Sequence, residues 1–354
     1  MEGPCAGSVV CAWGAERPAS TGDKTINKKI RVIQYGLGPI GSAAAKLIAE
    51  RDSLELVGAV DIDPAKVGKN LSDLIGIDRS LGIEVRGSID EVGAGADVIL
   101  HTTNSYFDQF KGQILELLDG GFDIVSTSEE LLFPWLDNPD AANEIDAAAK
   151  KAGKTVLGTG VNPGFLMDSL PLFITSIAQR VDHIDVTRVI NASTRRGPFQ
   201  AKIGCGLTAE QFNARMAEGR MGHVGIPESV AMTFDTLGKK LVKFENDVVP
   251  VIADTPVSTD DFDVETGQVR GLHQSCTAHT EDGEFLSLSF RAALNEEPAG
   301  DTITIKGHPD LVVTLQGTNG DIATVAMAVN AIKNTKNAAP GLVTMRDLPI
   351  VTIF

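Results

Sequence analysis

Two adjacent glutamates, Glu129 and Glu130, interrupt an otherwise apolar stretch of the sequence, "DIVSTSEELLFPW". An apolar run, Ile124 and Val125, precedes them, and a hydrophobic segment, 131–135, follows. An ionised carboxylate is costly to bury without a partner. We therefore expect one of two outcomes. Either these glutamates reach solvent at the start of a short helix, where acidic residues are favourable, or one of them has a chemical task.

The chemical task that suits a partly buried glutamate is proton transfer. Desolvation raises the pKa of a carboxyl group, and its negative form attracts an ammonium group. An enzyme that transfers hydride also needs a group that moves a proton to or from the substrate. The polar loops that we expect beside these glutamates contain no cysteine or lysine, and their only histidine, His101, precedes its polar run.

A glycine-rich segment predicts a dinucleotide site. Gly36, Gly38 and Gly41 form G-x-G-x-x-G between a predicted strand and a predicted helix, and Asp61 ends the next strand twenty residues later. This arrangement binds pyrophosphate at the helix N-terminus and ribose hydroxyls at the acidic residue. The alternative is that the glycines only form a tight turn. The complete predicted segment is Gly36, Leu37, Gly38, Pro39, Ile40 and Gly41.

Asp61 favours NAD as the cofactor, because a carboxylate repels the 2′-phosphate of NADP. NADP stays possible, since Lys66 or Lys69 could compensate for that repulsion.

The elements that must position these residues alternate along the first half of the chain. Strands rich in valine and isoleucine alternate with amphipathic helices, which is typical of an α/β Rossmann fold with a doubly wound parallel sheet. The predicted strands are 30–36, 54–63, 83–87, 96–103, 122–128 and 154–160. The first predicted helix lies within 36–54, and the others are 63–76, 107–121 and 139–153. Ligands of such sheets bind at the carboxyl ends of the strands, where "HTTNSYF", "STSEE" and "GTGVNPGF" should meet.

The second half has a different pattern. Asn162 and Pro163 are predicted to begin a helix, and Thr208 to Gln211 form a capping box. Alternating strands then dominate, which predicts a second α+β domain with a mixed, largely antiparallel sheet and helices on one side. A last helix, 320–334, is expected to be capped by Asp321 and to return to the first domain. The predicted divisions are an arm or tail, 1–28; the Rossmann domain, 29–160; a substrate and dimerisation domain, 161–318; and a C-terminal segment, 319–354.

Composition narrows the possible partners. The formal net charge of −16 argues against nucleic-acid binding, which needs a basic surface. No apolar run is long enough to span a membrane. The four cysteines are scattered and no metal site is indicated. We expect a cytoplasmic protein with a small-molecule substrate and no membrane partner.

Several segments together resemble a known family. "GLGPIG", "VDIDPAKVGK", "STSEELLFPW", "GTGVNPGFLMD" and "GHVGIPES" are similar to the native amine dehydrogenases related to 2,4-diaminopentanoate dehydrogenase, within the larger set that resembles dihydrodipicolinate reductase. The likeness spans about 29–350. It implies a homodimer that uses NAD(P)H to reduce imines formed from ammonia and ketones or aldehydes, and to deaminate amines in reverse.

The resemblance also implies residue roles. The family's catalytic glutamate follows the fifth strand, which places the role on Glu129, with Glu130 as second choice. The implied cofactor contacts are Thr102, Thr103, Asn104, Ser128, Asn162 and Pro163, together with the glycine-rich segment and Asp61. The implied substrate contacts are Tyr106, Phe107, Phe165, Asp168 and His223, although His223 could instead cap a turn. The chain lacks the paired histidines and the Lys-x-Asp-Ala-Pro-Ser-Gly run of dihydrodipicolinate reductases, so a dipicolinate-type diacid substrate is not expected.

Other interpretations stay open on the sequence alone. Arg195 and Arg196 could bind a substrate carboxylate or an acidic surface across a dimer. The protein could also be a related oxidoreductase acting on amino acid semialdehydes or cyclic imines, or a dinucleotide sensor that has lost catalysis.

Overall fold

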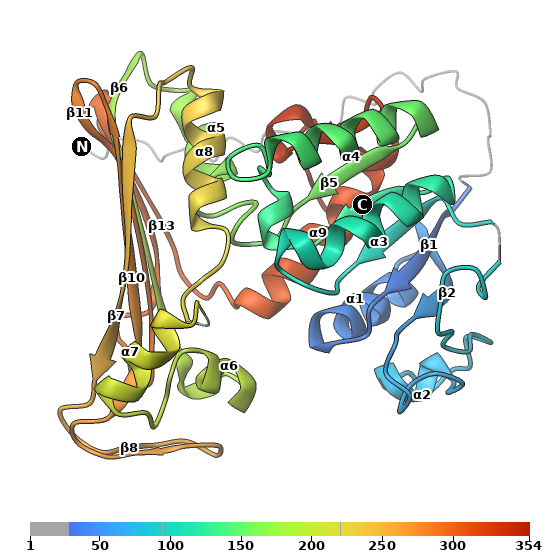
Figure 1. Cartoon of the computed structure of the whole chain (residues 1–354), viewed down its shortest axis with the longest axis horizontal. Coiled ribbons are helices and arrows are strands. Elements are labelled where there is room, and N and C mark those ends of the chain that lie inside the picture. Colours follow the sequence, from blue (N-terminus) through green and yellow to red (C-terminus); the bar gives the residue numbers. More distant parts are fainter. Residues whose placement is uncertain (1–27, 94, 220) are drawn as a thin grey trace, which may run out of the picture.

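The computed structural model describes residues 28–93, 95–219 and 221–354; the predicted N-terminal arm lies almost entirely outside them. Two six-stranded sheets stand apart, with a layer of helices between and around them (Figure 1). No helix in the described ranges is long and apolar enough to cross a membrane. The predicted α/β class, a Rossmann domain followed by an α+β domain, is confirmed.

The first sheet is parallel and has the order β14-β5-β4-β3-β1-β2. Helices α3 and α4 cover one face, and α1 and α9 pack against each other on the other (Figure 1). The last helix, α9, therefore packs on this domain. Its elements are β1 (Ile30–Tyr35), α1 (Pro39–Glu50), β2 (Leu54–Val60), α2 (Leu71–Ile75), β3 (Val98–His101), α3 (Phe107–Asp119), β4 (Asp123–Ser126), η1 (Glu129–Leu131), α4 (Pro139–Ala152), β5 (Thr155–Gly158), α9 (Gly320–Lys336), β14 (Gly341–Val343) and η3 (Met345–Asp347).

The second sheet has the order β13-β12-β6-β11-β10-β7. All its pairs are antiparallel except β6 with β11, as the predicted mixed sheet requires. Its helices lie on the side that faces the Rossmann domain (Figure 1). Its elements are α5 (Ser169–Thr175), β6 (Arg180–Asn191), η2 (Ala192–Thr194), α6 (Gly197–Lys202), α7 (Ala209–Ala217), α8 (Ile226–Thr236), β7 (Lys243–Ile252), β10 (Val269–Thr280), β11 (Gly283–Ala293), β12 (Gly300–His308) and β13 (Leu311–Leu315), with a separate pair β8 (Val257–Ser258) and β9 (Asp263–Val264).

Several predicted boundaries are wrong for local reasons. The segment 83–87 forms only isolated bridges, because Arg86 pairs with Val60 of β2 whereas Glu84 pairs with Asn70, so no run of residues shares one partner strand. The helix expected from Asp63 begins at Leu71, capped by Asn70, since the Asp63 carboxylate holds a turn by accepting from the Ala65 N–H.

Two helix caps also differ from the predictions. Asn162 and Pro163 lie in turns, and α5 begins at Ser169 with Asp168 as its cap. Helix α9 is capped by Asn319 rather than Asp321, because the Asn319 side chain accepts from two N–H groups of the first turn. The capping box of α7 is confirmed.

Candidate active site

A cavity of about 440 Å³ lies between the two sheets. The carboxyl ends of β3, β4 and β5 form one wall, and the inner face of the second sheet, α6 and the start of α9 form the other. The residues that line it include Thr102, Thr103, Asn104, Glu129, Asn162, Pro163 and His223 from the sequence predictions. The three polar loops therefore meet where parallel-sheet geometry requires.

The glycine-rich turn fits a dinucleotide. Gly36 has φ +91°, and a Cβ on Gly41 would lie 2.0 Å from the carbonyl oxygen of Gly36, so neither position tolerates a side chain. Nothing lies within 4 Å of the space that a Cβ on Gly38 would occupy. Gly38 supplies no side-chain cap to α1 and no acidic residue follows in the first turn, so the helix N-terminus is open to an anion.

A second, smaller cleft continues from this turn toward Asp61. One Asp61 oxygen accepts from the Leu37 N–H at 2.7 Å and from Lys66 Nζ at 3.1 Å, and the other accepts from the Asp63 N–H. Burial opposes ionisation of Asp61, but these hydrogen bonds and the Lys66 charge lower its pKa below the ordinary value. A fixed carboxylate thus lies where the adenosine ribose of a bound dinucleotide would lie.

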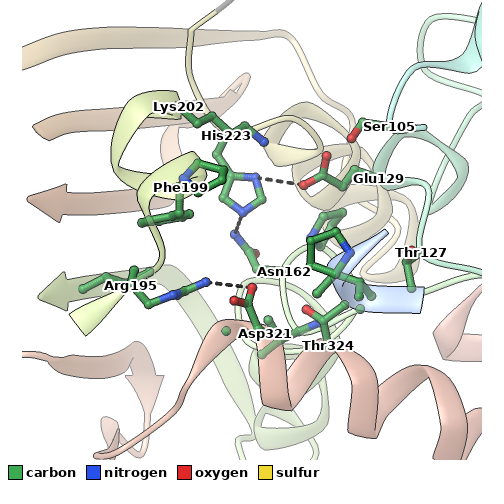
Figure 2. Close-up of a pocket in the computed structure, with 18 of the residues that line it drawn as sticks. Ser105, Thr127, Glu129, Asn162, Arg195, Phe199, Lys202, His223, Asp321 and Thr324 are labelled. Atoms are coloured by element: carbon green, nitrogen blue, oxygen red, sulfur yellow. Dashed lines mark hydrogen bonds and ion pairs between the residues drawn. The ribbon is translucent and has the colours of Figure 1, made fainter. Parts of the chain in front are cut away.

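Glu129 is the carboxylate that reaches the main cavity. It begins η1, and one of its oxygens, Oε2, is buried and has no hydrogen-bond partner among the described residues. The other oxygen lies 3.7 Å from His223 Nδ1, which is beyond hydrogen-bond distance. Figure 2 shows Glu129 projecting toward His223 from the opposite wall. A ligand with N–H donors would satisfy this carboxylate.

His223 forms part of the cavity wall as a neutral group. Its Nδ1–H donates to the Val224 carbonyl at 2.6 Å, and its Nε2 lies 3.2 Å from Asn162 Nδ2, whose N–H it can accept. Burial lowers the pKa of His223, outweighing the charge of Glu129. Phe290 meets the imidazole edge to face, with ring centroids 4.8 Å apart. His223 therefore positions Asn162 rather than competing with Glu129 for protons.

Glu130 points away from the cavity. Its Oε2 accepts the Phe107 N–H, so it satisfies a free donor at the start of α3. Burial raises its pKa despite this hydrogen bond. The paired glutamates thus have separate environments, one in the cavity and one at a helix end.

Some predicted contacts lie elsewhere in the structure. Phe107, the first residue of α3, packs in the core against Phe110. Phe165 packs against the core of the second domain. Asp168 is fully buried and accepts from the Gly164 N–H, the Ser169 N–H and both serine hydroxyls, Ser169 and Ser229.

These three positions are therefore corrections to the predicted cavity lining. Asp168 holds the loop after β5, and its pKa is raised by burial although the hydrogen bonds oppose the rise. Tyr106 is the half-exposed cap of α3, and Ser128 is buried beneath Glu129; neither lines the cavity.

Arg195 and Arg196 both line the cavity, but each also binds Asp321 at the start of α9, at 2.8 Å and 3.2 Å. This ion pair within the chain is neither of the two predicted roles. Figure 2 shows the Arg195–Asp321 pair on the side of the cavity away from Glu129.

Two buried charges were not predicted from the sequence. Arg188 lines the cavity from β6, and Glu228 lies in the first turn of α8. A signal for Arg188 existed, because Ile184, Val186 and Arg188 share the inward face of one alternating strand. A charge at an inward position needs a partner or a function. Nothing in the pattern of α8 singles out Glu228.

Among the residues that the structure describes, no cluster of histidine, cysteine, aspartate or glutamate is suited to a metal ion.

Comparison with known proteins decides the family. Residues 165–354 match the model of the 2,4-diaminopentanoate dehydrogenase C-terminal domain, and 30–110 match that of the dihydrodipicolinate reductase N-terminus. A 2,4-diaminopentanoate dehydrogenase from Acetoanaerobium sticklandii is 33% identical over 336 residues, covering 91% of this chain and 94% of its own. This chain belongs to the 2,4-diaminopentanoate dehydrogenase family.

Other members and neighbours agree with that assignment. An amine dehydrogenase from Streptomyces virginiae is 24% identical, covering 91% of this chain and 96% of its own. The solved amine dehydrogenase from Mycobacterium smegmatis superposes with a TM-score of 0.82 at 26% identity, covering 92% of this chain and 98% of that one. The predicted family and enzyme class, a dehydrogenase that uses a nicotinamide dinucleotide, are confirmed.

Proposed function

We propose that this family member catalyses the reductive amination of a small ketone or aldehyde with ammonia, and the reverse oxidative deamination of an amine. The observation that carries the proposal is the unpartnered, buried oxygen of Glu129 in a cavity that adjoins the glycine-rich turn. The names of the relatives, which refer to amines or to a diamino acid, support the same reaction.

In this reaction Glu129 handles the protons. Ammonium and the carbonyl condense to an iminium ion and water, which requires two protons to move in turn from nitrogen to the departing oxygen. The Glu129 carboxylate takes each proton, delivers it and then stabilises the positive iminium nitrogen. The dinucleotide supplies the hydride when bound. Asn162, whose Oδ1 has no hydrogen-bond partner in the described ranges, is placed to orient a donor group beside it.

The test is the oxidation of NADH in the presence of ammonia and a panel of small ketones and aldehydes. We expect turnover that requires ammonia, and a loss of roughly 100-fold or more in kcat for Glu129→Gln with NADH binding retained. Glu130→Gln should keep most of the activity, since an amide oxygen can still accept the Phe107 N–H. If Glu130→Gln is the inactive variant, the assignment is reversed.

The same assay separates the alternative functions. If NADH binds but no ammonia–carbonyl pair oxidises it, reductive amination is refuted. Turnover of amino acid semialdehydes or cyclic imines without ammonia would then favour the related oxidoreductase, and no turnover at all would favour a sensor.

We also propose NAD rather than NADP as the cofactor, because Asp61 is ionised and held in place at the adenosine end of the cleft. Lys66 neutralises part of this charge. Comparing NADH and NADPH as substrates tests the proposal directly.

A homodimer in the cytoplasm stays a prediction. Among the residues that the structure describes, no helix covers the face of the second sheet that lies away from the Rossmann domain (Figure 1). The half-exposed side chains of β10 on this face include His273, Ser275 and Thr277. We propose that a second copy covers this face, which light scattering on the purified protein would test.

A further inference from the structure

His101 is a fully buried histidine that plays no part in the proposed proton transfer. It ends β3, its side chain has no exposed surface, and its ring stacks on that of Tyr35 with centroids 5.6 Å apart. A buried imidazole is costly unless its nitrogens have hydrogen-bond partners. The partners of His101 therefore indicate what this residue holds in place.

Both nitrogens of the imidazole contact polar side chains. Nδ1 lies 2.9 Å from the hydroxyl of Ser126, which is directly opposite on the neighbouring strand β4. Nε2 lies 2.8 Å from Oε1 of Gln113, on α3, and 3.0 Å from the hydroxyl of Thr103. Burial lowers the pKa of His101 to about 4, although the hydrogen bond to Gln113 opposes the shift. The imidazole is therefore neutral at pH 7.

These contacts have one consistent set of donors and acceptors. An amide oxygen only accepts, so Nε2 of His101 carries the proton and donates to Gln113 Oε1, which also accepts from the Thr103 hydroxyl at 2.7 Å. Nδ1 then has a free lone pair, and the Ser126 hydroxyl donates to it. The Ser126 oxygen in turn accepts the Ser128 N–H at 3.1 Å. A continuous chain of hydrogen bonds, the His101 network, thus joins Ser128, Ser126, His101, Gln113 and Thr103.

The two ends of the His101 network lie at different parts of the proposed site. Ser128 directly precedes Glu129, and its carbonyl accepts the Leu131 N–H at 3.1 Å, so Ser128 begins the turn that presents Glu129. At the other end, Thr103 and Gln113 both line the smaller cleft beside the glycine-rich turn. The network therefore crosses the interior of the Rossmann domain from the cofactor cleft to the Glu129 turn.

The position of Glu129 depends on this turn because little else fixes its carboxylate. Oε2 has no hydrogen-bond partner among the described residues, and Oε1 lies 3.7 Å from His223 Nδ1. Figure 2 shows Glu129 and Thr127, two residues of the turn, on the same side of the cavity. A displacement of about 1 Å in a reacting group can cost roughly 100-fold in rate. A shift of the turn would therefore slow catalysis.

We propose that His101 is a positioning residue, whose two nitrogens hold the Glu129 turn in a fixed relation to the side chains that line the cofactor cleft. This inference rests on the proposed function. His101 itself transfers no proton to the substrate, because it is fully buried and is not among the residues that line the main cavity. One ring nitrogen serves each end of the network, so substitution can release the two ends separately.

The experiment uses three substitutions that keep different parts of the His101 network. His101→Asn places a carbonyl oxygen where Nδ1 lies and keeps the hydrogen bond from Ser126, whereas His101→Gln reaches the position of Nε2 and keeps the one to Gln113. His101→Phe keeps the ring shape and loses both. His183→Asn is the matched control, because His183 also contacts a serine hydroxyl, that of Ser287, but lies on β6 outside the main cavity.

Each variant is assayed for NADH oxidation with ammonia and a small ketone, and for NADH binding by fluorescence titration. We expect His101→Gln to lower kcat by roughly 10- to 100-fold with NADH binding unchanged, because only the Glu129 end is released. His101→Asn should keep kcat within about threefold and weaken NADH binding roughly three- to tenfold, the effect of one hydrogen bond. His101→Phe should show both losses, and His183→Asn neither.

Ser126→Ala tests the Glu129 end from the other side of the same hydrogen bond. It should lower kcat as His101→Gln does, and the double variant should lose no more than either single variant, since both substitutions remove one shared contact. Additive losses would show that the two residues do not act through each other, which overturns the inference.

Two further results would overturn the positioning role. Unchanged kcat and NADH affinity in His101→Phe would show that the network positions neither end. Parallel losses of kcat and NADH binding in all three His101 variants, in proportion to their losses of unfolding free energy in urea, would show that the residue serves stability alone.

A spectroscopic measurement separates this inference from the proposed function. NMR of wild type should show His101 protonated at Nε2. ADP-ribose, which lacks the nicotinamide, should shift the amide signals of Ser128 and Glu129 in wild type and leave them in place in His101→Phe. If no ammonia–carbonyl pair is turned over, the amination proposal fails while these signals still test the positioning role. A proton on Nδ1, or equal shifts in wild type and His101→Phe, would refute it.

Discussion

Glu228 makes the stability of this protein depend on pH in a way that one substitution should remove. Its side chain is 5% exposed, and its Oε2 has no hydrogen-bond partner among the described residues. Burial raises its pKa from 4.5 to about 8, and the negative charges of Glu130, Asp137 and Glu129 add to the rise. The folded protein therefore holds this carboxyl group neutral at pH 7.

The magnitude follows from the difference between the folded and unfolded pKa. Because the folded pKa is the higher one, the stabilisation is complete below pH 4.5 and is lost as the pH rises through about 8. One pKa unit corresponds to about 1.4 kcal/mol, so the full loss is roughly 5 kcal/mol. Between pH 6 and pH 9 the free energy of unfolding should fall by roughly 3 kcal/mol through this group alone.

The assay is urea denaturation of wild type and Glu228→Gln at pH 6 and pH 9. Glutamine keeps the shape of the side chain and cannot ionise. The free energy of unfolding of Glu228→Gln should therefore decline less over this pH range than that of wild type, by roughly 3 kcal/mol. Glu50→Gln, at the exposed end of α1, is the matched control and should decline as wild type does. An equal decline in wild type and Glu228→Gln would show that Glu228 is not held neutral, and the reasoning would be wrong.

Three further substitutions test the cofactor site and the loop after β5. Gly41→Ala should weaken NADH binding at least about tenfold, since its Cβ would lie 2.0 Å from a backbone oxygen; fluorescence titration measures this. Asp61→Ser should shift the ratio of NADPH to NADH efficiency upward by roughly tenfold, and an unchanged ratio would exclude Asp61 from cofactor selection. Asp168→Asn should lower the free energy of unfolding by roughly 2–4 kcal/mol, because an amide cannot accept all four hydrogen bonds. A raised substrate KM at unchanged stability would instead restore Asp168 to the substrate site.

The regular elements of the Rossmann half were predictable because their signals are local. Each signal depends only on a short stretch of sequence that has one favourable backbone geometry. These signals are the strand–helix alternation, the glycine spacing and Asp61. The errors occurred where a side chain had two possible uses. Asp63 could cap a helix or hold a turn, and Asn162 could cap a helix or line the cavity; contacts far away in the sequence made the choice.

The sequence by itself determined that a carboxylate would stand at the end of β4, since Glu129 and Glu130 follow the strand directly. Only the tertiary structure decided which one serves the cavity. The Phe107 N–H at the start of α3 donates a hydrogen bond to Glu130. Glu129 is therefore left to face His223, which belongs to the second domain. The His101 network likewise depends on packing between separate segments, because the burial of a side chain and its hydrogen-bond partners are properties of neighbours that the local sequence does not specify.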